Sequence, residues 1–189
     1  MCSTEARFSN AQRQQLLQLA RDSIAQGVQH SCALAVNTRD FPDALCAERA
    51  CFVTLLMNGA LRGCIGTLEA HRPLVEDIAH NAYAAAFRDP RFAPLRKQEL
   101  AKLEIHLSIL SPPQPLTFRN EADLLAQLRP GIDGLILTAP GHRGTFLPSV
   151  WASLPRAEDF FRQLKRKAGL AENYWSPELH VERYTTEAF

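Results

Sequence analysis

The sequence predicts an α+β fold, in which a mixed or antiparallel sheet is flanked by helices. A hairpin pattern over residues 51–67 indicates antiparallel strands. Helical patterns over residues 9–28 and 73–87 supply helices that can cover a sheet. Further strand patterns follow without a regular strand–helix–strand period, which argues against a parallel α/β sheet. The 189 residues allow one domain with a smaller second lobe, because domains average roughly 150 residues.

The first two helices are bounded by residues typical of helix ends. Ser9 and Gln12 have the spacing of a capping box, and Gly27 is expected to stop the first helix. Pro73 suits the first position of the second helix, where its missing N–H costs nothing. That helix is expected to end before Asp89, because the residue preceding a proline is disfavoured in helical geometry.

The hairpin can be given a register from its turn. CFVTLLM and ALRGCIGT flank Asn58-Gly59, the strongest two-residue hairpin signal. A two-residue turn pairs Met57 with Ala60. The pairs that follow are Leu55 with Arg62, Thr54 with Gly63, and Val53 with Cys64. Arg62 and Cys64 are therefore expected to project from the same face.

The rest of the chain is divided by the same kinds of pattern. Residues 29–50 are expected to be mostly irregular, and Pro112-Pro113 breaks the chain after a strand. The further elements are expected to be a short charged helix at 97–103, a strand at 104–110, a helix at 120–128, a hairpin at 134–147, a helix at 155–169 and a strand at 179–184.

Composition excludes several function classes. Lys and Arg number 21 against 20 Asp and Glu, and the net charge of +1 makes nucleic-acid binding an unfavoured function. The five cysteines are irregularly spaced, which is not a disulfide framework. The N-terminus lacks the apolar stretch of a secretory signal, and no apolar run is long enough to cross a membrane. We therefore expect a soluble, reduced, cytoplasmic protein with no membrane partner.

The segment from Leu61 to Thr67 is the strongest candidate for chemistry. Gly63 and Gly66 weaken a strand, and such glycines often mark a bulge or a place where a ligand comes close. Arg62 on the same face as Cys64 would stabilise the thiolate, which is the nucleophilic form of cysteine. The alternative is structural: Cys64 packs as a small apolar side chain and the glycines let the strand bend.

Two other sites compete with this one. A zinc site would draw on Cys46, Cys51, Cys64 and His71, but their spacing fits none of the usual ligand patterns, and no metal or other cofactor is predicted. His106 and Ser108 share one face of a strand, yet no nucleophile elbow or acidic partner accompanies them. We expect these two to be ordinary polar groups at the surface.

Arg88, Asp89 and Arg91 follow the second helix and offer charged groups near the hairpin. They could clamp an anionic or carboxylate ligand. The alternative is a turn stabilised by Asp89 and internal ion pairs.

At LRGCIGT the sequence resembles a known family. The chain is similar to the AMMECR domain family, called AmmeMemoRadiSam system protein A in microbial genomes, from about residue 10 to its end. Matching segments, in the same order and spacing, are FVTL at 52–55, LRGCIG at 61–66, PL at 73–74, AFRDPRFAPL at 86–95, EL at 99–100, LSILSPP at 107–113, GLIL at 134–137, LP at 147–148 and KAGL at 167–170.

The resemblance implies a single AMMECR-type domain over residues 1–189, with a larger lobe, a smaller lobe and a groove between them. It also implies which residues form the site. The candidates carried over from the two motifs are Arg62, Gly63, Cys64 and Gly66, with Asp89, Pro90, Arg91 and Phe92. We assign catalysis to Cys64 and Arg62, and substrate binding to Gly63, Gly66, Thr67, Asp89 and Arg91.

The family's activity is not fixed by the resemblance, and two hypotheses follow. In the first, the chain is an enzyme or enzyme subunit in which Cys64 is a nucleophile or redox thiol. It would act with a Memo-like protein and a radical S-adenosylmethionine protein to modify a biomolecule. In the second, the chain is a non-catalytic adaptor that presents its groove to a protein or nucleotide partner, and Cys64 only packs.

Overall fold

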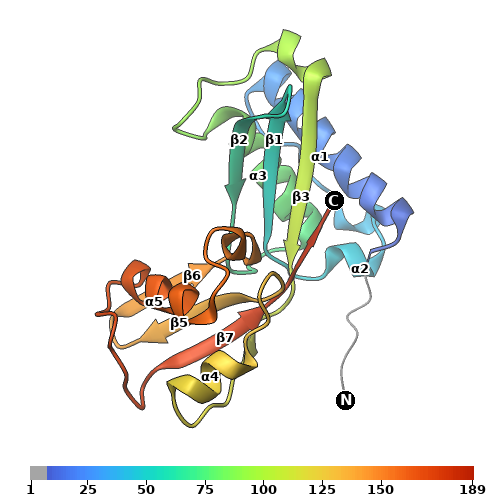
Figure 1. Ribbon diagram of the computed structural model, residues 1–189. Helices are drawn as coiled ribbons and strands as arrows, with labels where there is room; N and C mark the ends of the chain where they lie inside the picture. The colour runs from blue at the N-terminus through green and yellow to red at the C-terminus, as the bar shows by residue number, and fades with distance from the viewer. Residues whose placement is uncertain (1–7) are drawn as a thin grey trace. The chain divides into compact units, whose positions relative to one another are not determined.

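The computed structural model describes residues 8–189. The chain divides into two compact units, one formed by the residues up to Leu110 together with Glu187–Phe189, the other by Ser111–Thr186. Each unit contains its own four-stranded sheet and its own hydrophobic core (Figure 1). The helices and the two antiparallel sheets confirm the predicted α+β class.

The first unit is built from a sheet in the order β2-β1-β3-β8 and helices packed on it. Figure 1 shows α1 and α3 behind this sheet, with the opposite face turned to the viewer. Its elements are α1 (Asn10–His30), η1 (Thr38–Asp40), α2 (Asp43–Cys46), β1 (Cys51–Met57), β2 (Ala60–Gly66), α3 (Leu74–Phe87), η2 (Lys97–Lys102), β3 (Leu103–Leu110) and β8 (Thr186–Ala188).

Strand alternation decides which face of this sheet forms the core. Apolar residues at every second position of β1 and β3 are buried against α1 and α3, and they are Cys51, Val53, Leu55, Leu103, Ile105, Leu107 and Ile109. The intervening residues, including Thr54 and His106, lie on the other face and, except for the buried Leu110 at the end of β3, are partly or fully exposed. We call this second surface the open face of the sheet.

Two predicted boundaries of the first two helices are corrected: Pro73 is the N-cap of α3 and not its first residue, and Gly27 does not end α1. Ser9 caps α1 in a capping box with Gln12, as expected. Gly27, however, does not end the helix, which continues to His30. A side chain at this position would meet the Phe87 ring at 2.4 Å, so Gly27 serves the close packing of α1 on α3.

The predicted hairpin turn is correct, but the predicted register is wrong beyond it. Met57 pairs with Ala60, and the register then shifts by one residue at a β-bulge, so that Leu55 pairs with Gly63. The observed pairs are Thr54 with Cys64 and Val53 with Ile65. Because successive side chains alternate, this shift moves Cys64 from the core face to the open face.

The second unit packs its helices on a sheet in the order β4-β7-β5-β6. In its core, the Trp151 ring stacks on Phe160 with centroids 3.9 Å apart. Its elements are β4 (Gln114–Pro115), α4 (Glu121–Gln127), β5 (Gly134–Ala139), β6 (His142–Phe146), η3 (Pro148–Ala152), α5 (Ala157–Lys167) and β7 (His180–Tyr184). The strands β4 and β8 were not predicted, because each is only two or three residues long.

An ion pair between a buried ammonium and a partly exposed carboxylate joins α4 and α5 in the second unit. The Lys165 side chain is 1% exposed, and its ammonium donates to both carboxylate oxygens of Glu121 and to the Tyr174 carbonyl. The same ammonium lies over the Phe161 ring. Within residues 8–189, no helix combines the length and apolar character needed to cross a membrane.

Candidate functional site

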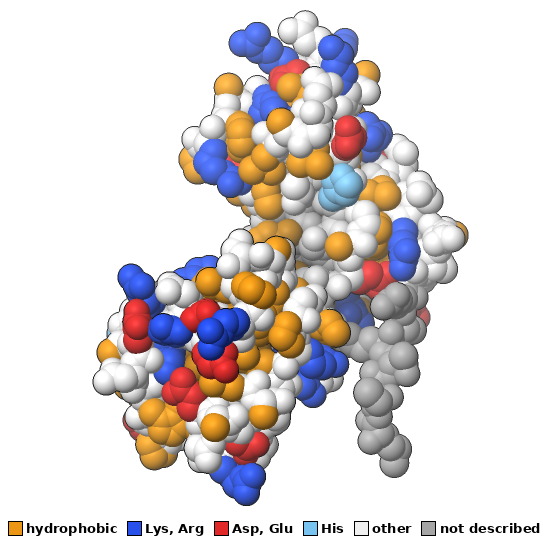
Figure 2. Space-filling view, in the orientation of Figure 1, with side chains coloured by type: hydrophobic (Ala, Val, Ile, Leu, Met, Phe, Trp, Pro, Cys, Tyr) orange, Lys and Arg blue, Asp and Glu red, His pale blue; other side chains and the backbone are white. Residues whose placement is uncertain are grey.

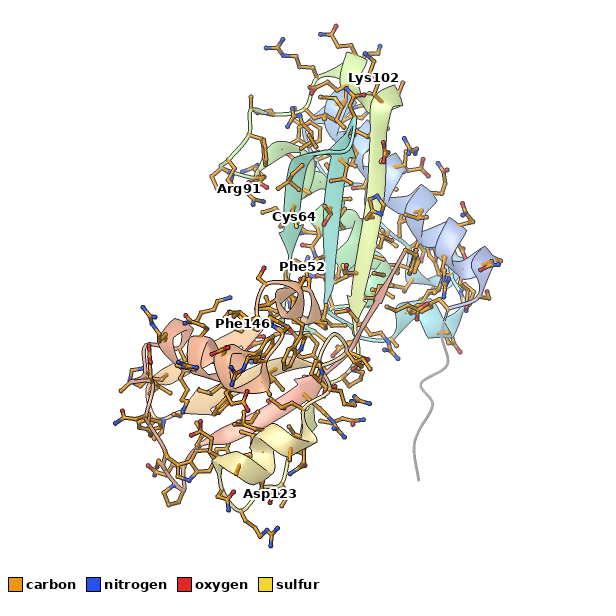
Figure 3. The ribbon with its side chains drawn as sticks, in the orientation of Figure 1. Phe52, Cys64, Arg91, Lys102, Asp123 and Phe146 are labelled. Carbon is orange, nitrogen blue, oxygen red and sulfur yellow. The ribbon has the colours of Figure 1, made fainter. Side chains whose placement is uncertain are left out.

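The candidate site lies on the open face of the first unit's sheet, at its β2 edge. Cys64 on β2 pairs with Thr54 on β1, which pairs in turn with His106 on β3. These three side chains therefore form a row across the strands. Figure 3 shows Cys64 on β2 with Arg91 on the outer side of that strand.

The Cys64 thiol is partly exposed and has one polar neighbour on the sheet. Its sulfur lies 3.3 Å from the Thr54 hydroxyl oxygen, within hydrogen-bond distance. Neighbouring strands lie about 4.8 Å apart, so the backbones of Cys64 and His106 are separated by roughly 10 Å. His106 is therefore not in direct contact with the thiol, and a group that touched both would have to lie across Thr54.

The backbone of Cys64 is held by two side chains from the loop after α3. Its N–H donates to Asp89 Oδ2 at 2.9 Å, and its carbonyl accepts from Arg91 Nη2 at 3.2 Å. The Arg91 guanidinium also donates two hydrogen bonds to the Asp89 carboxylate, at 2.9 and 2.7 Å, and the main-chain N–H of Arg91 donates a third, at 3.1 Å. The position of Cys64 is thus fixed from both its main-chain groups.

The two loop residues differ sharply in exposure. The Asp89 side chain is 2% exposed, whereas the Arg91 side chain is 54% exposed. The hydrogen bonds from Arg91 hold the pKa of Asp89 well below its usual range, against the opposing effect of burial, and the Cys64 N–H lowers it further. Asp89 is therefore charged at neutral pH and positions its neighbours, whereas the Arg91 side chain is open to solvent.

The two glycines of the motif are explained by packing within the first unit. A Cβ on Gly63 would lie 2.1 Å from the Ala85 carbonyl oxygen of α3, so the strand and helix backbones approach closely there. A Cβ on Gly66 would lie 2.4 Å from the Phe52 ring. Both glycines thus shape the strand that carries Cys64, and substrate binding by them remains a prediction.

Arg62 was predicted to lie beside the Cys64 thiol, but its guanidinium contacts Glu99. It lies at the bulge, and its guanidinium donates to both carboxylate oxygens of Glu99 in η2, at 2.9 and 3.2 Å. The Arg62 side chain is only 13% exposed. The cation that contacts Cys64 is therefore Arg91, through the Cys64 carbonyl, and the thiolate role given to Arg62 remains a prediction.

Thr67 belongs to a separate buried cluster around Asp77. The Thr67 hydroxyl donates to Asp77 Oδ2 at 3.0 Å, and the same oxygen accepts from the Asn81 amide and from the Cys51 thiol. Burial raises the pKa of the Cys51 thiol well above its usual value, and the Asp77 charge raises it further. Cys51 is therefore a neutral thiol that donates to a buried carboxylate, while Arg72 lies 3.5 Å from the other Asp77 oxygen.

The four residues considered for zinc are not brought together as ligands. The thiol of Cys51 points to Asp77 in the core, whereas that of Cys64 lies on the open face. Cys46 donates to the Thr38 carbonyl. Among the described residues, no three His, Cys, Asp or Glu side chains are grouped as a metal ion would require.

Sequence reasoning missed Thr54, Glu99 and Asp77 as partners of the motif residues. Asp77 did carry a signal, since an acid in the first turn of a helix that begins after Pro73 is favoured by the helix dipole. The burial of Asp77 depends on tertiary packing. So does the contact between Glu99 and Arg62, which are 37 residues apart in the sequence. No local pattern could reveal them.

The comparisons with known proteins agree with the matching segments. A sequence model of the AMMECR1 family matches residues 17–189. A protein of Methanothermobacter thermautotrophicus is 36% identical over 188 residues, covering 97% of this chain and 96% of that protein. One from Thermotoga maritima is 38% identical over 151 residues, covering 78% and 82%. The crystal structure of an uncharacterized protein from Pyrococcus horikoshii superposes with a TM-score of 0.77 at 30% identity, covering 92% of this chain and 88% of that one. The chain therefore belongs to the AMMECR1 family.

Proposed function

We propose that the protein is an enzyme, or the subunit of one, whose reactive group is the Cys64 thiol. The observation that carries the proposal is the way a partly exposed thiol is held. A buried carboxylate and its guanidinium bind both main-chain groups of Cys64, while its sulfur faces outward beside Thr54. Reactive groups are preorganised in this manner by hydrogen bonds from supporting residues.

Arg91 supplies the second part of the proposed site. Its guanidinium is oriented by Asp89, yet more than half of the side chain is exposed. The hydrogen bond and the charge of Asp89 raise the pKa of Arg91, so its guanidinium is charged at every ordinary pH. A fixed guanidinium beside a thiol suits an anionic group on a substrate, because guanidinium binds carboxylate and phosphate oxygens in defined directions.

Alkylation of the folded protein tests this function. Iodoacetamide modification followed by peptide mass spectrometry gives a rate for each cysteine, with Cys32 as an exposed reference and Cys51 as a buried one. We expect Cys64 to react faster than Cys32, and Arg91→Ala to slow it. The matched control is Arg62→Ala, which removes a cation held by Glu99 instead, and we expect it to leave the Cys64 rate nearly unchanged.

The opposite pattern would favour the adaptor hypothesis. If Cys64 reacts only when the protein unfolds, as Cys51 is expected to do, its thiol is structural and the enzyme proposal fails. A loss of reactivity in Arg62→Ala but not in Arg91→Ala would instead return the thiolate role to Arg62.

We also propose that the protein works in the cytoplasm with a Memo-like protein and a radical S-adenosylmethionine protein, in the modification of a biomolecule. The support is the family resemblance and a set of free thiols, at Cys32, Cys46, Cys51 and Cys64, which suits a reducing compartment. Affinity purification of the tagged full chain tests it. Recovery of neither partner at endogenous expression would remove this part of the proposal.

A further inference from the structure

Positive charge is concentrated in one segment of the first unit, next to the candidate site. Residues 88–102, which we call the basic segment, join α3 to β3 and contain five cations and two carboxylates. This segment therefore carries a net charge of +3, although the whole chain carries only +1. The other 174 residues have a net charge of −2. The end of α5 in the second unit holds another group of cations, at Arg162, Lys165, Arg166 and Lys167, so the excess is local to the basic segment only within the first unit.

Both carboxylates of the basic segment are already occupied. Asp89 is buried and bound to Arg91, and Glu99 accepts from Arg62 and from the main-chain N–H of Arg96. They fix the backbone of the segment and expose little negative charge. Beyond the segment, Glu104 is an exposed acid on the open face, two residues after Lys102 in the sequence.

Four of the cations, Arg88, Arg96, Lys97 and Lys102, are exposed and form no salt bridge with an acid among residues 8–189. Arg88 lies over the Tyr83 ring, 5.9 Å from its centroid. Lys97 and Lys102 have no carboxylate within 4.0 Å among the residues that the structure describes. In Figure 2, Lys and Arg side chains predominate over acids at the end of this unit where Figure 3 labels Lys102. Such a surface is favourable for a negatively charged partner.

The extent of the basic segment indicates an extended ligand. Lys97 and Lys102 stand at the two ends of η2, and a rise of about 2.0 Å per residue separates them by about 10 Å along its axis. Arg91 lies farther back along the segment, beside Cys64. Cations distributed along the segment in this way suit a chain of anionic groups better than a single carboxylate or phosphate.

We propose that the basic segment binds an acidic stretch of a protein and thereby brings it to Cys64, an inference that rests on the proposed reactive role of that thiol. Nucleic acid is the less suitable occupant, because single strands are held largely by stacking of bases on exposed rings. The only aromatic residue of the segment is Phe92, which is partly buried and lies beneath the Arg91 guanidinium at 5.5 Å.

The test compares two anionic probes on the full chain by fluorescence anisotropy. The probes are a fluorescein-labelled oligo-glutamate peptide and a single-stranded oligonucleotide of equal charge. We expect the peptide to bind more tightly, with an affinity that falls as salt rises. Lys97→Glu combined with Lys102→Glu should weaken the peptide by about tenfold, since each reversal replaces an attraction by a repulsion.

A matched control separates a specific surface from bulk charge. Arg39→Glu combined with Arg156→Glu changes the net charge equally at exposed positions outside the basic segment. Equal weakening in this control, tighter oligonucleotide binding, or no binding of the peptide would each overturn the proposal. Cys64→Ser should retain peptide binding, so loss of thiol reactivity and loss of binding report separately on the two proposals.

Discussion

Gly63→Ala tests whether the close contact between β2 and α3 fixes the candidate site. The added Cβ would lie 2.1 Å from the Ala85 carbonyl oxygen, whereas ordinary contacts begin at 3.4 Å, so the two backbones must separate by about 1.3 Å. Overpacking a core costs about 1–3 kcal/mol. Because the atom that the new Cβ meets belongs to the backbone and cannot rotate away, we expect a cost at the upper end, about 3 kcal/mol. At about 2–4 °C per kcal/mol for a chain of this size, Tm should fall by about 6–12 °C.

Calorimetry and cysteine alkylation together measure the effect. Gly59→Ala is the matched control, because Gly59 has φ +76° but no atom within 4 Å of the added Cβ. It should cost only about 1 kcal/mol of backbone strain. We expect Gly63→Ala also to change the alkylation rate of Cys64, which Gly59→Ala should not. A Tm for Gly63→Ala that is no lower than that of the control would refute the packing argument.

Three further predictions concern buried charges and hydroxyls. The pKa of Asp89 is lower in the folded protein than its unfolded value of about 4. The contribution of Asp89 to stability is therefore complete above about pH 5 and is lost as pH falls. In urea unfolding, Asp89→Asn should show a smaller loss of stability in acid than the unchanged protein. Burial raises the pKa of Tyr184 to about 12, above its unfolded value of about 10, so the contribution of Tyr184 to stability should be constant below about pH 10 and be lost as pH rises from there through about 12. Tyr184→Phe should reduce this loss. Glu121→Ala should lower the free energy of unfolding by about 3–5 kcal/mol, because it leaves the buried Lys165 ammonium without its carboxylate. Lys165→Met should lower it clearly less, since the Glu121 carboxylate left behind is 41% exposed. A reversed order of the two urea midpoints would contradict this assignment.

The parts of the fold that depend on local signals could be predicted from the sequence. The turn could be predicted because Asn-Gly is the dipeptide that best tolerates positive φ at both central positions of a two-residue hairpin turn. Asn58 and Gly59 both have positive φ in the structure. The capping box at Ser9 also follows from chemistry within one turn of helix. In each case the interactions that decide the structure lie within a few residues of one another.

The orientation of Cys64 could not be predicted in the same way. The β-bulge at Arg62 sits where Glu99 binds the guanidinium and where Gly63 meets the Ala85 backbone. Both partners are distant in sequence, so a register propagated from the turn put Cys64 on the core face. The contact between Arg91 and the Cys64 carbonyl depends on the same tertiary arrangement.

The hydrogen bonds to the main chain of Cys64 have a consequence for how molecules of this protein meet one another. β2 is an outer strand of its sheet, and unpaired N–H and C=O groups on such a strand can recruit a strand from another molecule. Asp89 and Arg91 occupy these groups at Cys64, in the place where a foreign strand would bind. The side chains that orient the thiol therefore also oppose intermolecular β-sheet growth, so that mutations weakening this loop would promote aggregation.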